Sequence, residues 1–333
     1  MTAKILKLGS AALIGLTAMS APALAEETMT SGESAYIFNT LLFLMAGFMV
    51  MFMAAGFAML EAGMVRSKNV AIQCTKNISL FSIAGIMYYL VGYNLMYDGV
   101  DAGFIGSLSL WSPDDAGALA DVPAFGEGEG YAAASDWYFQ MVFVATAASI
   151  VSGTLAERIK LWPFLLFTVV LTGFIYPIQG AWQWGGGWLS EMGFSDFAGS
   201  TIVHSTGGWA ALVGAIILGA RYGKFGANGE INVMPGSSMP LATLGTFILW
   251  LGWFGFNGGS QLALGSASNA IDVSQIFINT NMAAAAGVVT AMILTQLLYT
   301  KVDLTMALNG ALAGLVSITA EPLTPTLGSA AMI

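Results

Sequence analysis

The sequence contains few charged residues. Lys, Arg, Asp and Glu make up 9% of its 333 residues, whereas a soluble domain carries roughly 25%. This excludes an ordinary soluble domain. Hydrophobic residues make up 56% and glycine is frequent, which is typical of a polytopic membrane protein whose helices pack closely through small residues. The formal net charge of −9 argues against nucleic acid as a partner.

Cysteine and histidine are nearly absent. The single cysteine, Cys74, excludes an internal disulfide and any cysteine-based metal cage. His204 is the only histidine, so a zinc site of ordinary spacing is excluded as well. The sequence also contains no recognisable nucleophile–base pair and no phosphate-binding loop. We therefore expect no metal, no cofactor and no enzymatic activity.

The first residues match a secretory signal. Two lysines precede a short apolar stretch over residues 8–19, and the letters ALA at residues 23–25 form an A-x-A cleavage pattern. We predict a cleaved signal peptide over residues 1–25 rather than an additional, uncleaved helix. The membrane domain then covers residues 26–333, and its new N-terminus lies outside the cytoplasm.

Apolar runs of spanning length follow one another along the rest of the chain. Each is close to the roughly 20 residues that a helix needs to cross about 30 Å of hydrocarbon. We therefore predict an all-α polytopic membrane protein with eight spans in this chain. The spans lie at about residues 36–59, 70–97, 134–156, 161–180, 199–220, 239–262, 275–299 and 304–320.

The positive charges support this count. If the mature N-terminus is outside, the inner loops are those after spans one, three, five and seven. All basic residues beyond the signal are predicted to lie in or beside those loops, and cytoplasmic loops carry the excess of Lys and Arg. We therefore predict a multi-pass protein of the inner (plasma) membrane. These basic residues are Arg66, Lys68, Lys76, Arg158, Lys160, Arg221, Lys224 and Lys301.

One ionisable residue lies inside a predicted span. In the stretch DFAGSTIVHSTGGWAAL, His204 is about 10–12 Å along the helix axis from Phe197, near the bilayer midplane. Ionisable residues in spans usually mark function or tight pairing. Two interpretations stay open: a neutral imidazole bonded to the helix backbone, or an imidazole that lines a pore. Ser195 or Asp196, at the start of the same helix, fits an N-cap, and the helix dipole favours a carboxylate there.

Aromatic residues form a second group. Phe139 and Phe143 are four residues apart on one face of the third span, and Trp184 precedes three glycines at the end of the fourth. Interfacial anchoring and core packing explain most such rings. An indole held by a tight glycine turn can also present its face to a small cation. The sixth span adds Trp253, Phe254, Phe256 and Ser260.

Six motifs together resemble those of one family. They are GMVRSKN, LAERIK, WGGGWL, DFAGSTIVH, GWFGFNGGS and ALNGALAGLVSIT, in collinear order between about residues 36 and 320. They resemble the Amt/MEP/Rh ammonium transporters, bacterial Amt branch. The resemblance implies homotrimers with a pore in each subunit, and an Amt-type bundle of eleven helices with inverted repeats. About eight of these eleven helices are present in this chain.

The resemblance also implies an activity and an outer binding site. The family moves ammonium or ammonia across the membrane, and its recruitment site for ammonium corresponds to Trp184, Phe143 and Ser260. Asp196 looks like the family's essential aspartate beneath that site. A bare ammonium ion is costly to desolvate, and a ring face and a hydroxyl can replace part of its water.

The pore residues follow from the same resemblance. His204 looks like the first of two pore histidines. Two stacked phenylalanine rings gate the pore, and Phe256 pairs with either Phe139 or Phe143, of which Phe143 fits the family better. Thr319 falls where the family has a residue near the outer site, and we include it among the pore-lining residues.

The chain departs from the family in one respect. The second pore histidine of the family lies on a later helix, and this sequence has no second histidine. The final letters, TPTLGSAAMI, resemble the opening of another apolar segment, so we expect a C-terminally truncated chain. The tail through which the family binds PII-class regulators is absent too. An ammonium sensor of the same fold, or a transporter of another small solute, are the alternatives to ammonium transport.

Overall fold

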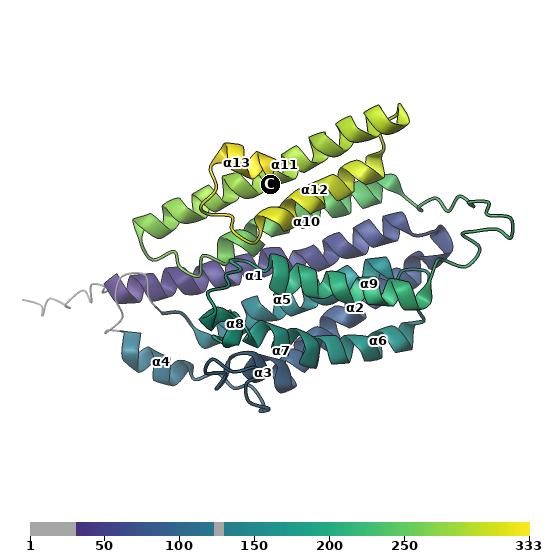
Figure 1. The fold of residues 1–333 in the computed structure, drawn as a ribbon. Coiled ribbons are helices and arrows are strands. Elements are labelled where there is room, and N and C mark those ends of the chain that lie inside the picture. The colour runs from purple at the N-terminus through teal and green to yellow at the C-terminus, as the bar shows by residue number, and fades with distance from the viewer. Residues whose placement is uncertain (1–30, 123–129) are drawn as a thin grey trace, which may run out of the picture.

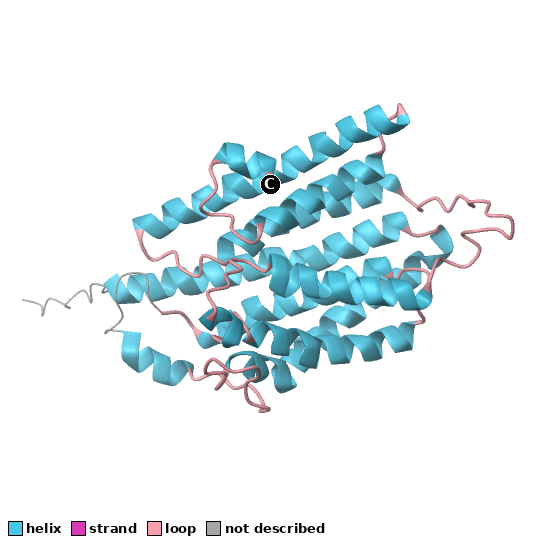
Figure 2. Ribbon diagram, in the orientation of Figure 1, coloured by secondary structure: helices cyan, strands magenta, loops and turns pink. Residues whose placement is uncertain are grey.

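The computed structural model describes residues 31–122 and 130–333. The expected signal peptide, residues 1–25, lies outside these ranges. Within them, regular structure is helical apart from one isolated β-bridge between Phe225 and Ile231. The long helices lie side by side in one bundle (Figure 1), and most loops gather at its two ends (Figure 2).

The elements follow one another in the order below, and three of them are turns of π-helix that continue directly into an α-helix. They are α1 (Ser31–Met64), η1 (Ser67–Asn69), α2 (Val70–Met87), η2 (Tyr88–Gly92), α3 (Tyr93–Tyr97), α4 (Asp115–Asp121), α5 (Ala133–Thr154), α6 (Leu161–Val170), η4 (Leu171–Ile175), α7 (Tyr176–Ala181), α8 (Trp188–Glu191), η5 (Ser200–Ser205), α9 (Thr206–Leu218), α10 (Met239–Gly259), α11 (Ala267–Tyr299), α12 (Leu304–Ile318) and α13 (Leu327–Met332).

Six helices of the described part are long and apolar enough to cross a membrane. They are Ser31–Met64, Ser67–Tyr97, Leu161–Ala181, Ser200–Leu218, Met239–Gly259 and Ala267–Tyr299. Each corresponds to one of the eight predicted spans. The other two predicted spans are the helices α5 and α12, which lie along the bundle in Figure 1. α12 has 15 residues, and α5 carries Asp136 and Gln140 near its start, so these two have less apolar length.

Glycines let the helices approach closely. A Cβ added to Gly245 of α10 would overlap the backbone of Leu60 in α1, and a Cβ on Gly287 of α11 would overlap the carbonyl of Gly310 in α12. Close backbone approach increases the van der Waals contact that holds membrane helices together. α5 packs against α1, α2 and α9, and most of its residues are buried. The helix that lies deepest in the bundle is therefore one of the least apolar.

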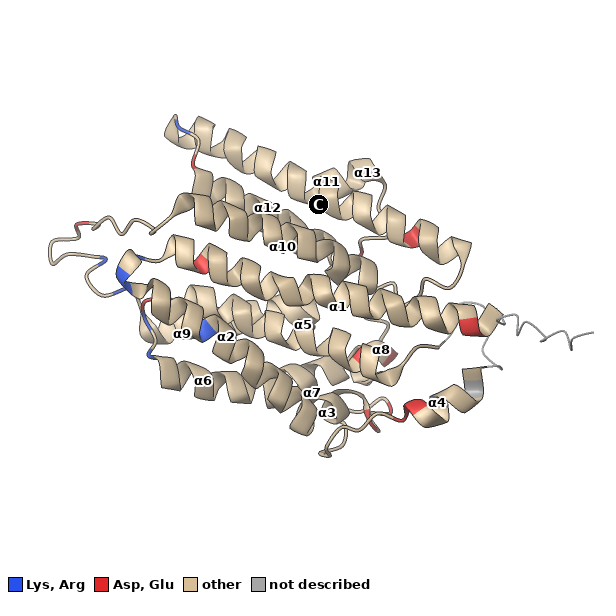
Figure 3. Cartoon of the chain, turned by 180° about the vertical axis from the view of Figure 1, so that it is seen from behind, with Lys and Arg blue, Asp and Glu red and all other residues tan. Residues whose placement is uncertain are grey.

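The basic residues gather at one end of the bundle (Figure 3). This end, called the basic end below, holds residues 65–69, 155–160, 219–238 and 300–303. Lys76 departs from the sequence prediction, because it lies inside α2 and is 2% exposed rather than placed in or beside a loop. Its ammonium group donates to the Ser152 carbonyl at 2.9 Å, which a loop position would not require.

Glu157 ties three segments together at the basic end. It accepts from Arg66 and Arg221 at 3.0 Å each and from Asn69. Burial by itself raises the pKa of Glu157, but the hydrogen bonds from Asn69, Arg66 and Arg221 outweigh it and lower the pKa from 4.5 to about 2. The carboxylate is therefore ionised at neutral pH, and it joins the end of α1 to the loops after α5 and α9.

Candidate functional site

The carboxylate of Asp196 caps a helix. Its oxygens accept four backbone N–H bonds, from Gly199 and Ser200 at 3.0 Å each and from Thr201 and Ile202 at 2.8 and 2.9 Å. The residue is 1% exposed. A helix start leaves N–H groups without partners, and the helix dipole favours a negative charge there. Asp196 therefore fixes the start of η5 with its side chain, but the N-cap residue itself is Gly199, three residues later than predicted for Asp196.

Gly199 orients the imidazole of His204 through a hydrogen bond. Its φ of 106° lies in the left-handed region that favours glycine, and its carbonyl lies 3.0 Å from Nδ1 of His204. A carbonyl oxygen can only accept, so Nδ1 carries the hydrogen and Nε2 of the neutral ring is an acceptor. Within the described residues Nε2 has no partner, and His204 is 6% exposed. One nitrogen is thus bonded to the backbone, and the other is free for a ligand.

Four aromatic rings are connected to this imidazole, two of them directly, and they are here named the aromatic column: Trp184, Phe143, Phe256 and Trp253. Trp184 meets Phe143 edge-on at 6.0 Å, and Phe143 stacks on Phe256 with ring centroids 3.9 Å apart. Phe256 lies 5.2 Å from the ring of His204, which stacks on Trp253 at 4.9 Å. Ring contacts therefore run without a break from Trp184 to His204.

The geometry distinguishes the two phenylalanine pairs that the sequence left open. Phe143 stacks on Phe256 with their planes at 28°. Phe139, one turn earlier on α5, instead touches the edges of Phe143 at 4.7 Å and of Phe43 at 5.3 Å. Phe139 is 1% exposed. It therefore packs behind the stacked pair instead of being part of it.

Trp184 and Ser260 lie at the end of the column that is far from the basic end. Nε1 of Trp184 donates to the main-chain carbonyl of Asp196 at 2.8 Å. Ser260 follows α10, one turn beyond Phe256, and its hydroxyl donates to the Phe256 carbonyl at 2.8 Å. Both residues are partly exposed, so this end of the column is open to its surroundings.

Thr319 lies behind the column. It is fully buried at the end of α12, and its hydroxyl is 2.7 Å from Nε1 of Trp253 and 3.1 Å from Oδ1 of Asn257. An indole N–H only donates, so the Thr319 hydroxyl accepts from Trp253. Thr319 thus holds Trp253 in its place against His204, and it is not among the residues that line the cavity next to them.

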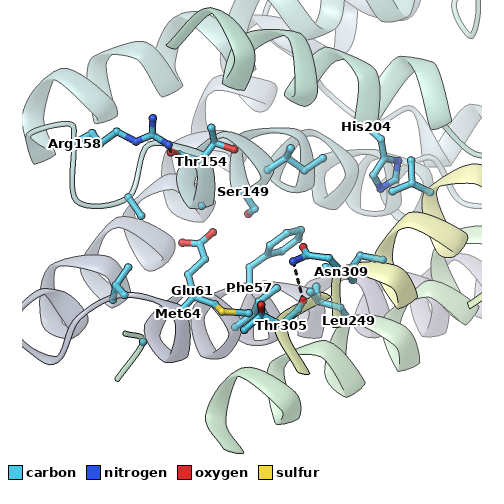
Figure 4. A pocket seen from close by; sticks show the side chains of 18 of the residues that line it. Phe57, Glu61, Met64, Ser149, Thr154, Arg158, His204, Leu249, Thr305 and Asn309 are labelled. Atoms are coloured by element: carbon cyan, nitrogen blue, oxygen red, sulfur yellow. Dashed lines mark hydrogen bonds between the residues drawn. The ribbon is translucent and has the colours of Figure 1, made fainter. Parts of the chain in front are cut away.

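A cavity of about 1150 Å³ extends from His204 toward the basic end (Figure 4). Its walls come from α1, α5, α10, α12 and η5, and from residues 65, 156, 158, 221 and 234–236 outside these helices. The ionisable groups that line it in the described part are His204, Glu61, Arg158 and Arg221. The structure therefore joins Trp184, Phe143, Phe256 and His204 in one continuous series of ring contacts, and His204 lines the cavity.

Sequence reasoning missed two residues of this region. Trp253 was counted only as one aromatic residue of its span, although it lies three residues before Phe256 and so shares its helix face. Glu61 was missed because the first span was predicted to end at residue 59, whereas α1 continues to Met64. Glu61 is therefore an acidic residue inside the bundle, 5% exposed.

Comparison with known proteins identifies the family. The model of the Ammonium Transporter Family matches residues 41–333, which is most of the chain. The chain belongs to the ammonium transporter family. It is therefore a multi-pass membrane protein of a transport family, and the predicted all-α fold class is confirmed. Its relatives are named as transporters, which also confirms that it is not an enzyme.

Individual relatives agree with this assignment. Amt2 of Archaeoglobus fulgidus is 46% identical over 289 residues, and a putative ammonium transporter of Synechocystis sp. is 43% identical over 298 residues. These alignments cover 83% and 88% of this chain, but 58% and 65% of the relatives. The solved structure of a sensor Amt protein superposes with a TM-score of 0.81 at 38% identity, covering 90% of this chain and 72% of that one. The chain thus spans about three fifths of the length of these curated family members.

Proposed function

We propose that this family member moves ammonium or ammonia across the membrane along the aromatic column and past His204. One observation carries the proposal, namely the order of groups from the partly exposed end of the column to the cavity. The partly exposed Trp184 and Ser260 come first, then two stacked rings, then an imidazole with a free acceptor nitrogen, and finally an open cavity. This is the order that dehydration, passage and release of ammonium require.

Recruitment takes place at the accessible end of the column. Ammonium loses part of its water here, because the faces of Trp184 and Phe143 attract a cation and the Ser260 hydroxyl oxygen accepts one of its N–H bonds. The hydrogen bond from Trp184 to the Asp196 carbonyl holds the indole in place. The carboxylate of Asp196 does not bind the ammonium ion directly, because it already accepts hydrogen bonds from four backbone N–H groups. It acts through its negative field and by setting the helix that carries His204.

The stacked rings of Phe143 and Phe256 form the gate. At a centroid separation of 3.9 Å the rings are in van der Waals contact, so one of them must turn before anything passes. A narrow apolar passage offers nothing to replace the water of a metal ion, and such ions are therefore rejected. Ammonia crosses more readily than ammonium, because it carries no charge.

His204 lies directly beyond the gate. Its Nε2 is the acceptor of the neutral ring, so it takes a hydrogen bond from ammonia or a proton from ammonium. The family's second pore histidine has no counterpart in this sequence. His204 is therefore the one imidazole of these 333 residues that can serve such a relay.

We further propose that the basic end faces the cytoplasm of a cell bounded by this inner (plasma) membrane, because positive residues stay on that side during insertion. Trp184 and Ser260 then face outward. The family resemblance supports a homotrimer with a pore in each subunit, and a PII-class protein as a regulatory partner.

A sensor is the second candidate function. The solved sensor Amt protein is 38% identical to this chain and superposes over 90% of it. A sensor must bind ammonium at the recruitment site, but it need not move much ammonium across the membrane. Ammonium that changes the tryptophan fluorescence of the protein in liposomes, without accumulating inside them, would favour this function over transport.

Uptake measurements test the transport proposal. Cells that lack their own ammonium uptake should accumulate labelled methylammonium, saturably, once they make this protein. Trp184→Ala should raise the KM for uptake about tenfold, equivalent to ~1.4 kcal/mol of lost binding. Trp188→Ala is the matched control, because Trp188 follows the same glycine turn but stacks on Phe104 outside the column. Absence of uptake by the unsubstituted protein, or equal KM values for the two variants, would overturn the proposal.

A further inference from the structure

A buried polar cluster lies between α1, α2 and α5, away from the aromatic column. Oε2 of Glu61 accepts hydrogen bonds from the amide of Gln73, from Asn77 at 2.8 Å and from Ser152 at 2.9 Å. Lys76 completes the cluster by donating to the Ser152 carbonyl at 2.9 Å and to Oε1 of Gln73 at 3.3 Å. Such polar groups within a membrane-spanning bundle are costly, which makes them candidates for a function.

One oxygen of this cluster has no partner. Oε1 of Glu61 is buried and accepts no hydrogen bond from any described residue. Three hydrogen bonds to Oε2 fix the orientation of the carboxylate. The group therefore cannot rotate to bring Oε1 within reach of the same donors. Glu61 lines the cavity below His204, and its carboxylate points into that space in Figure 4. A buried oxygen without a partner costs free energy, and a donor arriving from the cavity would recover it.

The neighbouring cationic side chains, Lys76 and Arg158, do not bond to Oε1 of Glu61. The Lys76 ammonium is directed at its two hydrogen-bond acceptors, Ser152 and Gln73, and lies 4.7 Å from the centre of the Phe164 ring. Its charge balances part of the negative charge of Glu61, yet Oε1 stays open. The guanidinium of Arg158, which lines the same cavity, donates to the carbonyls of Thr154 and Gly219.

We propose that Oε1 of Glu61 binds an ammonium ion in this cavity, as a second station between His204 and the basic end. The proposal rests on the proposed function. Glu61 is the only carboxylate among the described lining residues, and ammonium offers N–H donors to its free oxygen. Gly153 leaves room beside it, because even an added Cβ there would come no closer than 3.4 Å to Oε1. A single accepting oxygen with a lysine nearby holds the ion weakly, as release requires.

Glu61→Gln removes the negative charge of the side chain and keeps its size and most of its hydrogen bonds. The amide oxygen can accept the hydrogen bonds that Oε2 now accepts, and the NH₂ group takes the place of Oε1. Glu230→Gln is the matched control, because Glu230 is exposed in a loop of the basic end and does not line the cavity. Gly153→Ala is a second variant, which adds a methyl group beside Oε1 and leaves the carboxylate unchanged.

Infrared difference spectra of the purified protein give the direct readout, with ammonium chloride compared with sodium chloride. We expect an ammonium-specific change in a carboxylate band that Glu61→Gln abolishes, Gly153→Ala weakens and Glu230→Gln preserves. In uptake assays Glu61→Gln should lower the maximal rate about tenfold with an unchanged KM, because recruitment is untouched.

The two proposals fail in different ways. A carboxylate change that persists in Glu61→Gln, or an undiminished maximal rate in that variant, overturns the second station while leaving transport in place. If Glu61→Gln does not fold, an unweakened change in Gly153→Ala overturns it. Absence of uptake by the unsubstituted protein overturns the proposed function, and the infrared comparison still decides whether Glu61 binds ammonium.

Discussion

The imidazole of His204 lies nearly flat on the indole of Trp253, with ring centroids 4.9 Å apart and planes at 20°. Each ring is also held by a hydrogen bond that its own N–H group donates. The Gly199 carbonyl accepts from Nδ1 of the imidazole, and the Thr319 hydroxyl accepts from the indole N–H. Groups from η5, α10 and the end of α12 therefore decide where Nε2 of His204 points.

Removal of the indole tests this arrangement. Trp253→Leu should lower the maximal rate of methylammonium uptake about tenfold, equivalent to ~1.4 kcal/mol, because the imidazole loses its stacking support. Trp209→Leu on α9 is the control, since that indole is exposed on the outside of the bundle. Equal uptake by the two variants would show that the stack does not position His204.

Asp196 should contribute more to stability than an ordinary helix cap. Asp196→Ala leaves four N–H groups without their acceptor, and those of Gly199 and Ile202 are buried, so we expect a loss of about 2 kcal/mol or more. Asp303→Ala removes an exposed cap that accepts from Thr305 and Met306, and should cost about 1 kcal/mol. Thermal unfolding in detergent compares the two. A smaller loss for Asp196→Ala than for Asp303→Ala would contradict the capping role.

Close packing of α11 and α12 depends on Gly287. Gly287→Ala places a methyl group against the Gly310 carbonyl, and we expect it to destabilise the protein by about 1–3 kcal/mol. Gly208→Ala is matched in chemistry, but a Cβ there meets nothing within 4 Å. That variant should be neutral, or stabilising by up to about 1 kcal/mol through helix propensity. The midpoints of thermal unfolding decide between a packing effect and a general intolerance of alanine.

Glu157 should make the basic end sensitive to acid. Its pKa is about 2 in the folded protein against an ordinary value of 4.5. A group with a lowered folded pKa stabilises the protein above its unfolded pKa, and that stability is lost as the pH falls through the folded pKa. The difference in unfolding temperature between the unsubstituted protein and Glu157→Gln should therefore be constant above pH 5 and shrink between about pH 4.5 and 2. A difference that does not change with pH would assign the effect to packing.

Apolar runs predicted eight spans, and six of them are helices long and apolar enough to cross a membrane. α5, also predicted as a span, is less apolar, because it packs among other helices and can carry Asp136 and Gln140 near its start. Lys76 was predicted to lie in or beside a loop for a related reason. Acceptors on α2 and α5 make a buried ammonium tolerable, and a linear sequence does not show that these residues meet.

The sequence by itself determined the class of the molecule through composition and the family through six collinear motifs. The resemblance carried by those motifs pointed to Trp184, Phe143, Phe256, His204 and Asp196, but not to Trp253 of the column. Only the tertiary structure decided which phenylalanine stacks on Phe256, that Thr319 supports Trp253, and that Glu61 faces a cavity. Each of these depends on helices that are distant in the chain, because stacking, hydrogen bonding and burial act through space.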